Sequence, residues 1–300
     1  MLAYMDEVIM HYKEAKGLLS ADNNMNIYRG CTHGCIYCDA RSDCYQFSHD
    51  FQDVEVKKNA AELLEDALRR KKKKCMIKTG YMSDSYNHYE EKLGLTRECL
   101  EIIDKYNFGV AIQTKSKLIL RDIDLLKKIN EKTKCVVQVT MTTYDDELCK
   151  LIEPNVSTTK ERFEILKALQ ENNIPAVVWL SPILPFINDT VENMNGLLEY
   201  CKTTNVKGLI CYGVGVTLRN GNRQYFYSQL DRSFPGVKRL YEKTYGDMYD
   251  CRSRNDYTVM NMITRFCKQN SVLLNQATFD YMDRYEDKGA GVQISLFDYL

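Results

Sequence analysis

The 300-residue sequence has no excess of either charge, because 41 basic side chains balance 41 acidic ones. With no net field to attract a polyanion, a nucleic acid would have to contact a local patch of the surface. Long apolar runs are also missing, since no stretch approaches the roughly 18 residues that cross a bilayer. Charged residues interrupt the apolar pattern of residues 1–17, which excludes a signal peptide there. We therefore predict a cytoplasmic protein without a membrane partner, in which residues 1–20 form an N-terminal helix.

Internal repeats and low-complexity segments are absent from the sequence as well, whereas cysteine is abundant. Three of the twelve cysteines lie within eight positions, and the other nine are scattered along the chain. In a reducing compartment, scattered cysteines act mostly as small buried hydrophobic residues. We expect that role for most of these nine.

Helical and strand-like patterns alternate through most of the chain. Apolar residues recur at helical spacing in five segments, and short β-rich runs bounded by glycine or proline lie between them. The expected helices span 54–70, 95–106, 123–130, 158–172 and 191–203. The expected strands begin near residues 25, 75, 108, 135, 175 and 208. Because such alternation favours parallel βαβ units with right-handed crossovers, the predicted fold class is α/β, a partial (β/α)6 TIM-type barrel.

The predicted barrel spans residues 21–216, and two further regions follow it. Residues 217–285 have the pattern of a helical C-terminal extension, and residues 286–300 form a glycine-bearing tail. In parallel α/β architectures, functional side chains gather at the C-terminal ends of the strands. Polar residues and glycines follow each expected strand of this chain, which predicts one functional rim.

A loop after the first expected strand carries the most specific signal. Cys31, Cys35 and Cys38 have the spacing C-x3-C-x2-C, and Gly30 and Gly34 let the backbone turn so that three thiolates converge. Three thiolates on a four-iron four-sulfur cluster leave one iron open to bind a substrate or a cofactor. The spacing therefore favours an iron–sulfur cluster with an open coordination position.

A zinc site is the alternative for the same loop. Structural zinc takes four ligands, and Cys44 or His33 could supply the fourth. The corresponding function is a zinc-stabilised nucleic-acid-binding module.

The cysteine loop and several later segments together resemble a known family. The loop, with the aromatic Tyr37 just before its last cysteine, is similar to the radical S-adenosylmethionine superfamily. More narrowly, the resemblance is to spore photoproduct lyase-like proteins, and it runs from about residue 26 to about residue 215. The segments that carry it are YRGCTHGCIYC, YMSDSY, EEKLGLTRECLEII, QTKSKLILRDIDLL, IEPNVSTTKERFEILKALQENNIP and SPILPFIND.

The resemblance implies two cofactors, a [4Fe-4S] cluster and S-adenosylmethionine. The open iron would bind the amino and carboxylate groups of S-adenosylmethionine, and reductive cleavage would give methionine and a 5′-deoxyadenosyl radical that abstracts hydrogen from a substrate. A one-electron donor of the flavodoxin or ferredoxin type is implied as a partner. The implied cluster ligands are Cys31, Cys35 and Cys38, and the implied cofactor-binding residues are Tyr37, Gly80, Ser83, Asp84, Lys115, Thr140 and Thr142.

Individual roles follow the family pattern, with one departure. Tyr37 matches an aromatic residue near the adenine, and Lys115 matches a lysine that pairs with the methionine carboxylate. Asp84 would hold the methionine ammonium or a ribose hydroxyl, or bond to its own turn. The DNA-repairing lyases place a hydrogen-donor cysteine where Met82 stands here, and a thioether has no S–H to donate. The resemblance thus suggests a lyase-like, DNA-repair-like enzyme acting on nucleic acid, whereas Met82 argues against thymine-dimer repair.

The tail contains a second, shorter resemblance. Residues 293–297, QISLF, resemble the pentapeptide by which bacterial repair and replication proteins dock on the DNA sliding clamp. Gln293 would be the polar anchor, while Leu296 and Phe297 would fill an apolar pocket. A C-terminal element that packs back on the barrel is the other explanation. If the tail does dock, a further rival function is an inactive barrel scaffold recruited to the clamp.

Overall fold

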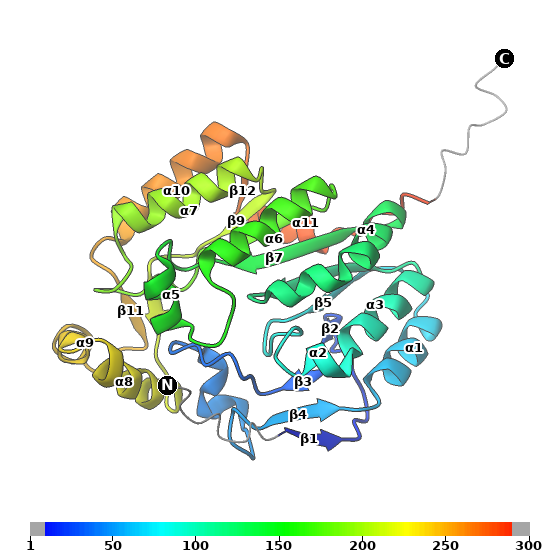
Figure 1. The fold of residues 1–300 in the computed structure, drawn as a ribbon, viewed down its shortest axis with the longest axis horizontal. Helices are drawn as coiled ribbons and strands as arrows, with labels where there is room; N and C mark the ends of the chain where they lie inside the picture. The colour runs from blue at the N-terminus through cyan, green and yellow to red at the C-terminus, as the bar shows by residue number, and fades with distance from the viewer. Residues whose placement is uncertain (1–9, 290–300) are drawn as a thin grey trace.

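A computed structural model describes residues 10–289, and a parallel sheet of seven strands forms its centre (Figure 1). The strands lie in the order β12–β9–β8–β7–β6–β5–β2, so successive strands of the barrel are neighbours in space. The predicted α/β fold class, a partial TIM-type barrel, is confirmed. The strand bounds are Asn24–Met25 for β2, Met76–Thr79 for β5, Gly109–Thr114 for β6, Cys135–Thr140 for β7, Ala176–Trp179 for β8, Gly208–Ile210 for β9 and Leu273–Leu274 for β12.

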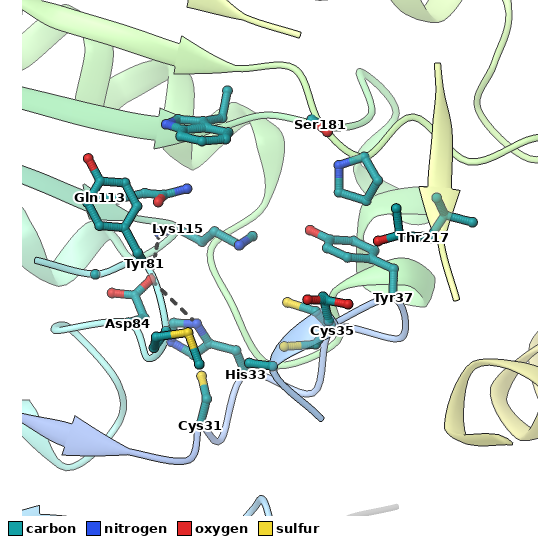
Figure 2. A pocket seen from close by; sticks show the side chains of 18 of the residues that line it. Cys31, His33, Cys35, Tyr37, Tyr81, Asp84, Gln113, Lys115, Ser181 and Thr217 are labelled. Atoms are coloured by element: carbon teal, nitrogen blue, oxygen red, sulfur yellow. Dashed lines mark hydrogen bonds and ion pairs between the residues drawn. The ribbon is translucent and has the colours of Figure 1, made fainter. Parts of the chain in front are cut away.

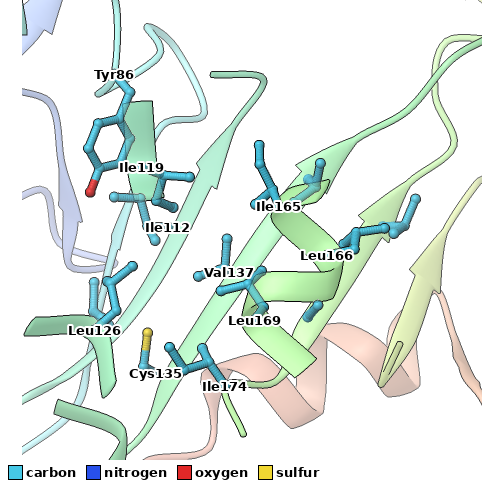
Figure 3. Packing of buried hydrophobic residues seen from close by; sticks show 14 of the residues in the cluster. Tyr86, Ile112, Ile119, Leu126, Cys135, Val137, Ile165, Leu166, Leu169 and Ile174 are labelled. Atoms are coloured by element: carbon cyan, nitrogen blue, oxygen red, sulfur yellow. The ribbon is translucent and has the colours of Figure 1, made fainter. Parts of the chain in front are cut away.

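Helices between the strands cover the outside of this sheet. Helix α6 begins at a capping box, in which Thr158 and Glu161 each satisfy the other's backbone N–H. Its apolar side chains Leu166 and Leu169 are fully buried in the core that also contains Val137 of β7 (Figure 3). The covering helices are α1 (Ala60–Arg70), α3 (Leu95–Lys105), α4 (Ile123–Lys132), α6 (Thr159–Glu171) and α7 (Val191–Thr203). Shorter elements are η1 (Asp39–Arg41), η2 (Asp43–Tyr45), α2 (Glu90–Leu93), η3 (Lys117–Asp122) and α5 (Asp146–Ile152).

A second, small sheet corrects two predictions for the N-terminal part. Strand β1 (Met10–Lys13) runs parallel to β4 (Val54–Lys57), which pairs on its other side with β3 (Tyr28–Arg29). The helix expected over 1–20 is therefore wrong for residues 10–13, and residues 1–9 lie outside the described range. The helix expected from residue 54 starts only at Ala60, because the preceding residues pair with two strands far away in the sequence.

The C-terminal extension is mainly helical, as expected, but it also completes the sheet. Strand β12 pairs with β9 in parallel, which adds a seventh strand to the six predicted. An antiparallel pair, β10 (Gly215–Thr217) and β11 (Asp250–Arg252), lies at the start of the extension. Its helices are α8 (Asn222–Ser233), α9 (Val237–Tyr245), α10 (Asp256–Asn270) and α11 (Gln276–Asp283).

The end of the described chain is fastened to the barrel by a buried lysine. Lys134, which immediately precedes β7, donates hydrogen bonds to the carbonyl oxygens of Tyr281 at 2.6 Å and Arg284 at 3.1 Å. Its ammonium also pairs with Glu286 at 2.8 Å. The docking motif predicted in the tail lies outside the described residues. Within residues 10–289, none of the helices combines the length and apolar character that a membrane crossing requires.

Candidate active site

The three clustered cysteines line one cavity of about 440 Å³ at the C-terminal ends of the barrel strands (Figure 2). Cys31 and Cys35 are buried and Cys38 is half-buried. Gly30 has a φ of +94°, and a Cβ there would lie 2.7 Å from the carbonyl oxygen of Phe51. The same carbonyl accepts a hydrogen bond from the Cys31 N–H at 3.0 Å. The glycine therefore allows the close approach that fixes the start of the loop.

The spacing of the sulfur atoms does not match a closed zinc site. The sulfur atoms of the three cysteines, all within residues 10–289, do not all lie within 4.8 Å of one another. Tetrahedral zinc with Zn–S bonds of about 2.3 Å would hold its sulfurs about 3.8 Å apart. Cys44, one proposed fourth ligand, is exposed, and its sulfur contacts Arg219. The cavity therefore fits a group wider than a single ion.

Residues 152–155 form hydrogen bonds to the backbone of the cysteine loop, and we call this segment the clamp. The N–H of Ile36 donates to the carbonyl of Ile152 at 3.0 Å. Asn155 donates its backbone N–H to the carbonyl of His33 at 3.2 Å and its side-chain amide to the carbonyl of Thr32 at 3.1 Å. These bonds satisfy backbone groups of a loop that has no secondary structure of its own. The positions of the cysteines thus depend on residues more than 100 positions away.

A fully buried ion pair extends this clamp to the core. The Tyr37 hydroxyl donates a hydrogen bond to Glu153, whose other carboxylate oxygen lies 2.6 Å from the Arg162 guanidinium. Both charged side chains are 0% exposed. Arg162 also donates to the carbonyl oxygens of Thr140 and Ser157, each at 2.9 Å. Removing either charge would leave the other buried without its ion-pair partner.

Four of the seven predicted cofactor-binding residues line the cavity, and three do not. Those that line it are Tyr37, Gly80, Asp84 and Lys115. The Ser83 hydroxyl instead donates to the carbonyl of Gly30 at 2.7 Å, and the Thr140 hydroxyl accepts from the Gln113 amide at 3.2 Å. Thr142 is buried outside the cavity lining.

Asp84 organises the ends of two strands. Its Oδ1 accepts from the Tyr86 N–H at 2.9 Å and from the Thr114 hydroxyl at 2.8 Å. Its Oδ2 accepts from the Lys115 N–H at 2.8 Å and lies 3.6 Å from His33 Nδ1. The bond to Tyr86 is the turn bond expected as one of its roles. Asp84 thereby ties the loop after β5 to the end of β6.

Lys115 places a positive charge inside the cavity. Its side chain extends across the cavity toward Tyr37 and Cys35 (Figure 2). Burial lowers the pKa of Lys115, but the neighbouring Cys35 sulfur and the Glu153 and Asp84 carboxylates raise it by more, so the net shift is upward. The ammonium is therefore charged at neutral pH and suits a ligand carboxylate.

Sequence reasoning missed an aromatic wall across the cavity from the cysteines. The rings of Tyr81 and Trp179 lie 6.4 Å apart, edge to face. The buried Gln138 joins them, since its amide accepts from Trp179 Nε1 at 2.8 Å and donates to the Tyr81 hydroxyl at 3.0 Å. Tyr212, which is 59% exposed, also lines the cavity. The one tryptophan of the chain, at the end of an otherwise aliphatic strand, was the available signal.

Arg41 is a second residue that sequence reasoning missed. Its guanidinium lies between two aromatic rings, 3.9 Å from the centroid of Tyr225 and 4.5 Å from that of Phe51. Its Nε and Nη2 atoms are buried, and no atom of the described chain accepts a hydrogen bond from them. This positive charge lies close enough to Cys38 to favour its thiolate, although burial, the largest effect, raises the pKa of that thiol. Lys115 and Arg41 thus place two positive charges near the cysteines.

The comparison with protein families identifies the class. Residues 25–199, more than half of the chain, match the family model of the Radical SAM superfamily. The chain belongs to this superfamily. Its cofactors are accordingly a [4Fe-4S] cluster and S-adenosylmethionine.

Individual relatives are more distant. Uncharacterized protein MJ0683 of Methanocaldococcus jannaschii is 37% identical over 167 residues, which cover 55% of this chain and 61% of that protein. Uncharacterized protein Rv2578c of Mycobacterium tuberculosis (strain H37Rv) is 27% identical over 232 residues, covering 74% and 66%. The chain thus spans about two thirds or less of the length of these relatives.

Among solved structures, spore photoproduct lyase complexed with dinucleoside spore photoproduct has a TM-score of 0.63 to this chain. The match covers 88% of this chain and 81% of that one, at 12% sequence identity. A structure of a spore photoproduct lyase point mutant, with the same coverage of both chains, gives a TM-score of 0.62 at 13% identity. At this identity the likeness shows a shared fold.

Proposed function

We propose that Cys31, Cys35 and Cys38 hold the [4Fe-4S] cluster and leave one iron to S-adenosylmethionine. The observation that carries this proposal is the convergence of three buried or half-buried thiols on one cavity. When bound, the reduced cluster and S-adenosylmethionine supply a 5′-deoxyadenosyl radical for hydrogen abstraction. The chain's own residues bind, orient and shield these groups.

The cavity residues divide this work. The Lys115 ammonium is placed to pair with the methionine carboxylate. Tyr37, within the cysteine loop, donates its hydroxyl to Glu153, and its ring forms part of the cavity wall. Asp84 keeps the Lys115 backbone in place through its 2.8 Å hydrogen bond. We infer that Asp84 positions Lys115, because its Oδ2 accepts the Lys115 N–H and its Oδ1 ties the neighbouring turn to Thr114.

We further propose a nucleic-acid substrate that enters across the aromatic wall. Aromatic side chains stack on bases of any sequence, and Tyr212 presents an exposed ring at the cavity. Arg252, which also lines the cavity and pairs with Asp250 and Asp256, lies 3.5 Å from the Tyr212 carbonyl oxygen. Met82 lines the same cavity, so the proposed lyase-like reaction uses no thiol hydrogen donor at that position.

The cluster assignment is tested by anaerobic reconstitution with iron and sulfide. We expect about four irons per chain and reductive formation of 5′-deoxyadenosine. Cys35→Ala should abolish both, whereas Cys44→Ala, which removes an exposed thiol, should leave both unchanged. A cluster and cleavage that persist in Cys35→Ala would refute the assignment. Cluster binding without cleavage in the unsubstituted chain would instead favour the inactive scaffold.

The substrate class has a separate test, because Trp179 is the only tryptophan in the chain. A single-stranded oligonucleotide that stacks in the cavity should quench its fluorescence. Tyr212→Ala should weaken binding roughly 5-fold to 100-fold, the effect of losing one stacking contact. Tyr257→Ala removes a tyrosine that is 80% exposed and outside the cavity lining, and should change nothing. Equal affinities in both variants would exclude this substrate class without affecting the cluster assignment.

Two partners and the compartment remain proposals of the same kind. A flavodoxin or ferredoxin would supply the electron, which fits a reducing cytoplasm and twelve cysteines that are all free. Docking on the sliding clamp through Gln293, Leu296 and Phe297 stays a prediction. Deleting residues 293–300 should abolish clamp binding and leave the iron content unchanged.

A further inference from the structure

Three potential metal ligands converge beside the small sheet, outside the cavity of the cysteines. His11 lies on β1, whereas His49 and Asp53 belong to the segment that leads from η2 into β4. Within residues 10–289, they form the one trio of His, Cys, Asp or Glu whose ligand atoms all lie within 4.8 Å of one another. None of the three lines the cavity described above.

His49 is prepared to act as a ligand. Its Nδ1 lies 2.9 Å from the carbonyl oxygen of Asp50, and a carbonyl can only accept, so Nδ1 carries the proton. Nε2 then has a free lone pair. This atom is buried, and the described chain offers it no hydrogen-bond partner. A histidine whose second ring nitrogen donates to a backbone carbonyl is the usual arrangement around a bound metal.

The other two side chains supply a nitrogen and negative charge. His11 Nδ1 lies 2.8 Å from the Asp53 carboxylate, and its Nε2 lies 3.9 Å from Glu55. Glu55 is only 5% exposed and pairs with Lys13 at 2.9 Å. Two carboxylates next to a single directly paired lysine leave negative charge available for a cation. The missing partner of the buried His49 Nε2 is explained when a metal ion occupies the space between these side chains.

We propose that His11, His49 and Asp53 bind a divalent transition-metal ion. Imidazole and carboxylate together suit zinc, which takes nitrogen and oxygen at about 2.0 to 2.2 Å in a tetrahedral arrangement. Its ligand atoms then lie about 3.4 Å apart, so a trio within 4.8 Å needs only a small inward movement.

The ion would join parts of the chain that support the cysteine loop. It would fasten β1 to the segment before β4, and in that segment the Phe51 carbonyl accepts the Cys31 N–H at 3.0 Å. The site shares no ligand with the proposed cluster. Its occupancy is therefore measurable whether or not the cluster assignment holds.

The test uses cluster-loaded protein, in which the cysteines are already occupied. The protein is equilibrated with Zn²⁺, freed of excess metal by gel filtration and analysed for zinc and iron. We expect one zinc per chain in addition to the cluster iron. His49→Gln and Asp53→Asn should each lose the zinc and keep the iron, which also shows that the variants fold. Asp50→Asn removes a neighbouring carboxylate outside the trio and should keep both metals.

Zinc-edge X-ray absorption of the unsubstituted protein keeps the proposal testable if the variants do not fold. A shell of nitrogen and oxygen at about 2.0 to 2.2 Å is expected, whereas sulfur ligands would appear at about 2.3 Å. A sulfur shell, the absence of bound zinc, or zinc that survives both His49→Gln and Asp53→Asn would each overturn the proposal.

Discussion

Replacing Glu153 by glutamine tests the buried clamp behind the cysteine loop. Glu153 and Arg162 are 0% exposed and lie 2.6 Å apart, so the substitution leaves a guanidinium buried without a counter-charge. Breaking such a pair from one side costs about 3–5 kcal/mol, a large part of the roughly 5–15 kcal/mol that holds a domain folded. Arg162→Met should cost at least as much, because it also leaves the carbonyls of Thr140 and Ser157 without a donor.

The double variant separates the ion pair from the rest of the clamp. Glu153→Gln combined with Arg162→Met leaves neither charge of the pair, so its cost should fall at least about 2 kcal/mol short of the sum of the two single costs. Urea unfolding, followed by circular dichroism and by Trp179 fluorescence, measures all three free energies of unfolding. Glu164→Gln, on the exposed face of the same helix, is the matched control and should stay within about 0.5 kcal/mol.

The same variants should also loosen the cysteine loop. Glu153→Gln replaces the carboxylate that accepts the Tyr37 hydroxyl, so the iron content after reconstitution should fall while Glu164→Gln retains it. A cost below about 1 kcal/mol for Glu153→Gln, or strict additivity in the double variant, would show that the pair does not support the loop.

Three further outcomes are expected. Gly80→Ala should destabilise the chain by about 2–4 kcal/mol in a urea titration, because its φ is +94° and a Cβ would lie 2.0 Å from the Gln113 carbonyl oxygen. The control Gly94→Ala, where no atom lies within reach of a Cβ, should cost about 1 kcal/mol. Equal costs in the two variants would contradict the steric argument. Burial raises the pKa of Asp104, but Lys128 and Lys132 lower it by more, so the folded pKa lies below the usual value. The carboxylate therefore stabilises the fold above about pH 4, and this contribution is lost as the pH falls through the folded pKa. Asp104→Asn should lower the free energy of unfolding by roughly 1 kcal/mol at pH 7 and by nothing in acid, which urea unfolding at several pH values measures. Arg41→Gln should lower the midpoint potential of the cluster by roughly 50 mV, since it removes a positive charge that favours the reduced state; a redox titration that shows no decrease would exclude this role.

Local patterns predicted most of the barrel because its elements are set by local spacing and caps. Helix α7 has the bounds expected, and α6 lies within one residue of them, since apolar periodicity and the Thr158 capping box act within one segment. The small sheet was missed for the opposite reason. Val54–Lys57 reads V-E-V-K, which is strand-like, but its partners in β1 and β3 are more than 20 residues away and leave no mark on the local pattern.

The sequence predicted the part of the site that depends on the spacing of residues along the chain, but it did not predict contacts between residues that are distant in the sequence. Three cysteines within eight residues indicate a shared ligand directly. Glu153 and Arg162 give no such signal, because charged residues are usually exposed and these two meet only after folding. Strand ends predicted the rim but not the direction of each hydroxyl, so Ser83 and Thr140 bond to the protein instead of lining the cavity.

The anchoring of the C-terminal segment by Lys134 separates two ends of the molecule. Lys132 is the last residue of α4 and its carbonyl accepts the N–H of Lys288, and Lys134 directly precedes β7, so both lie where the strand begins, at the end opposite the cavity. The chain therefore departs from the barrel on the side away from the cysteines. Contacts made by the last described residues and access to the cavity therefore use opposite ends of the barrel strands.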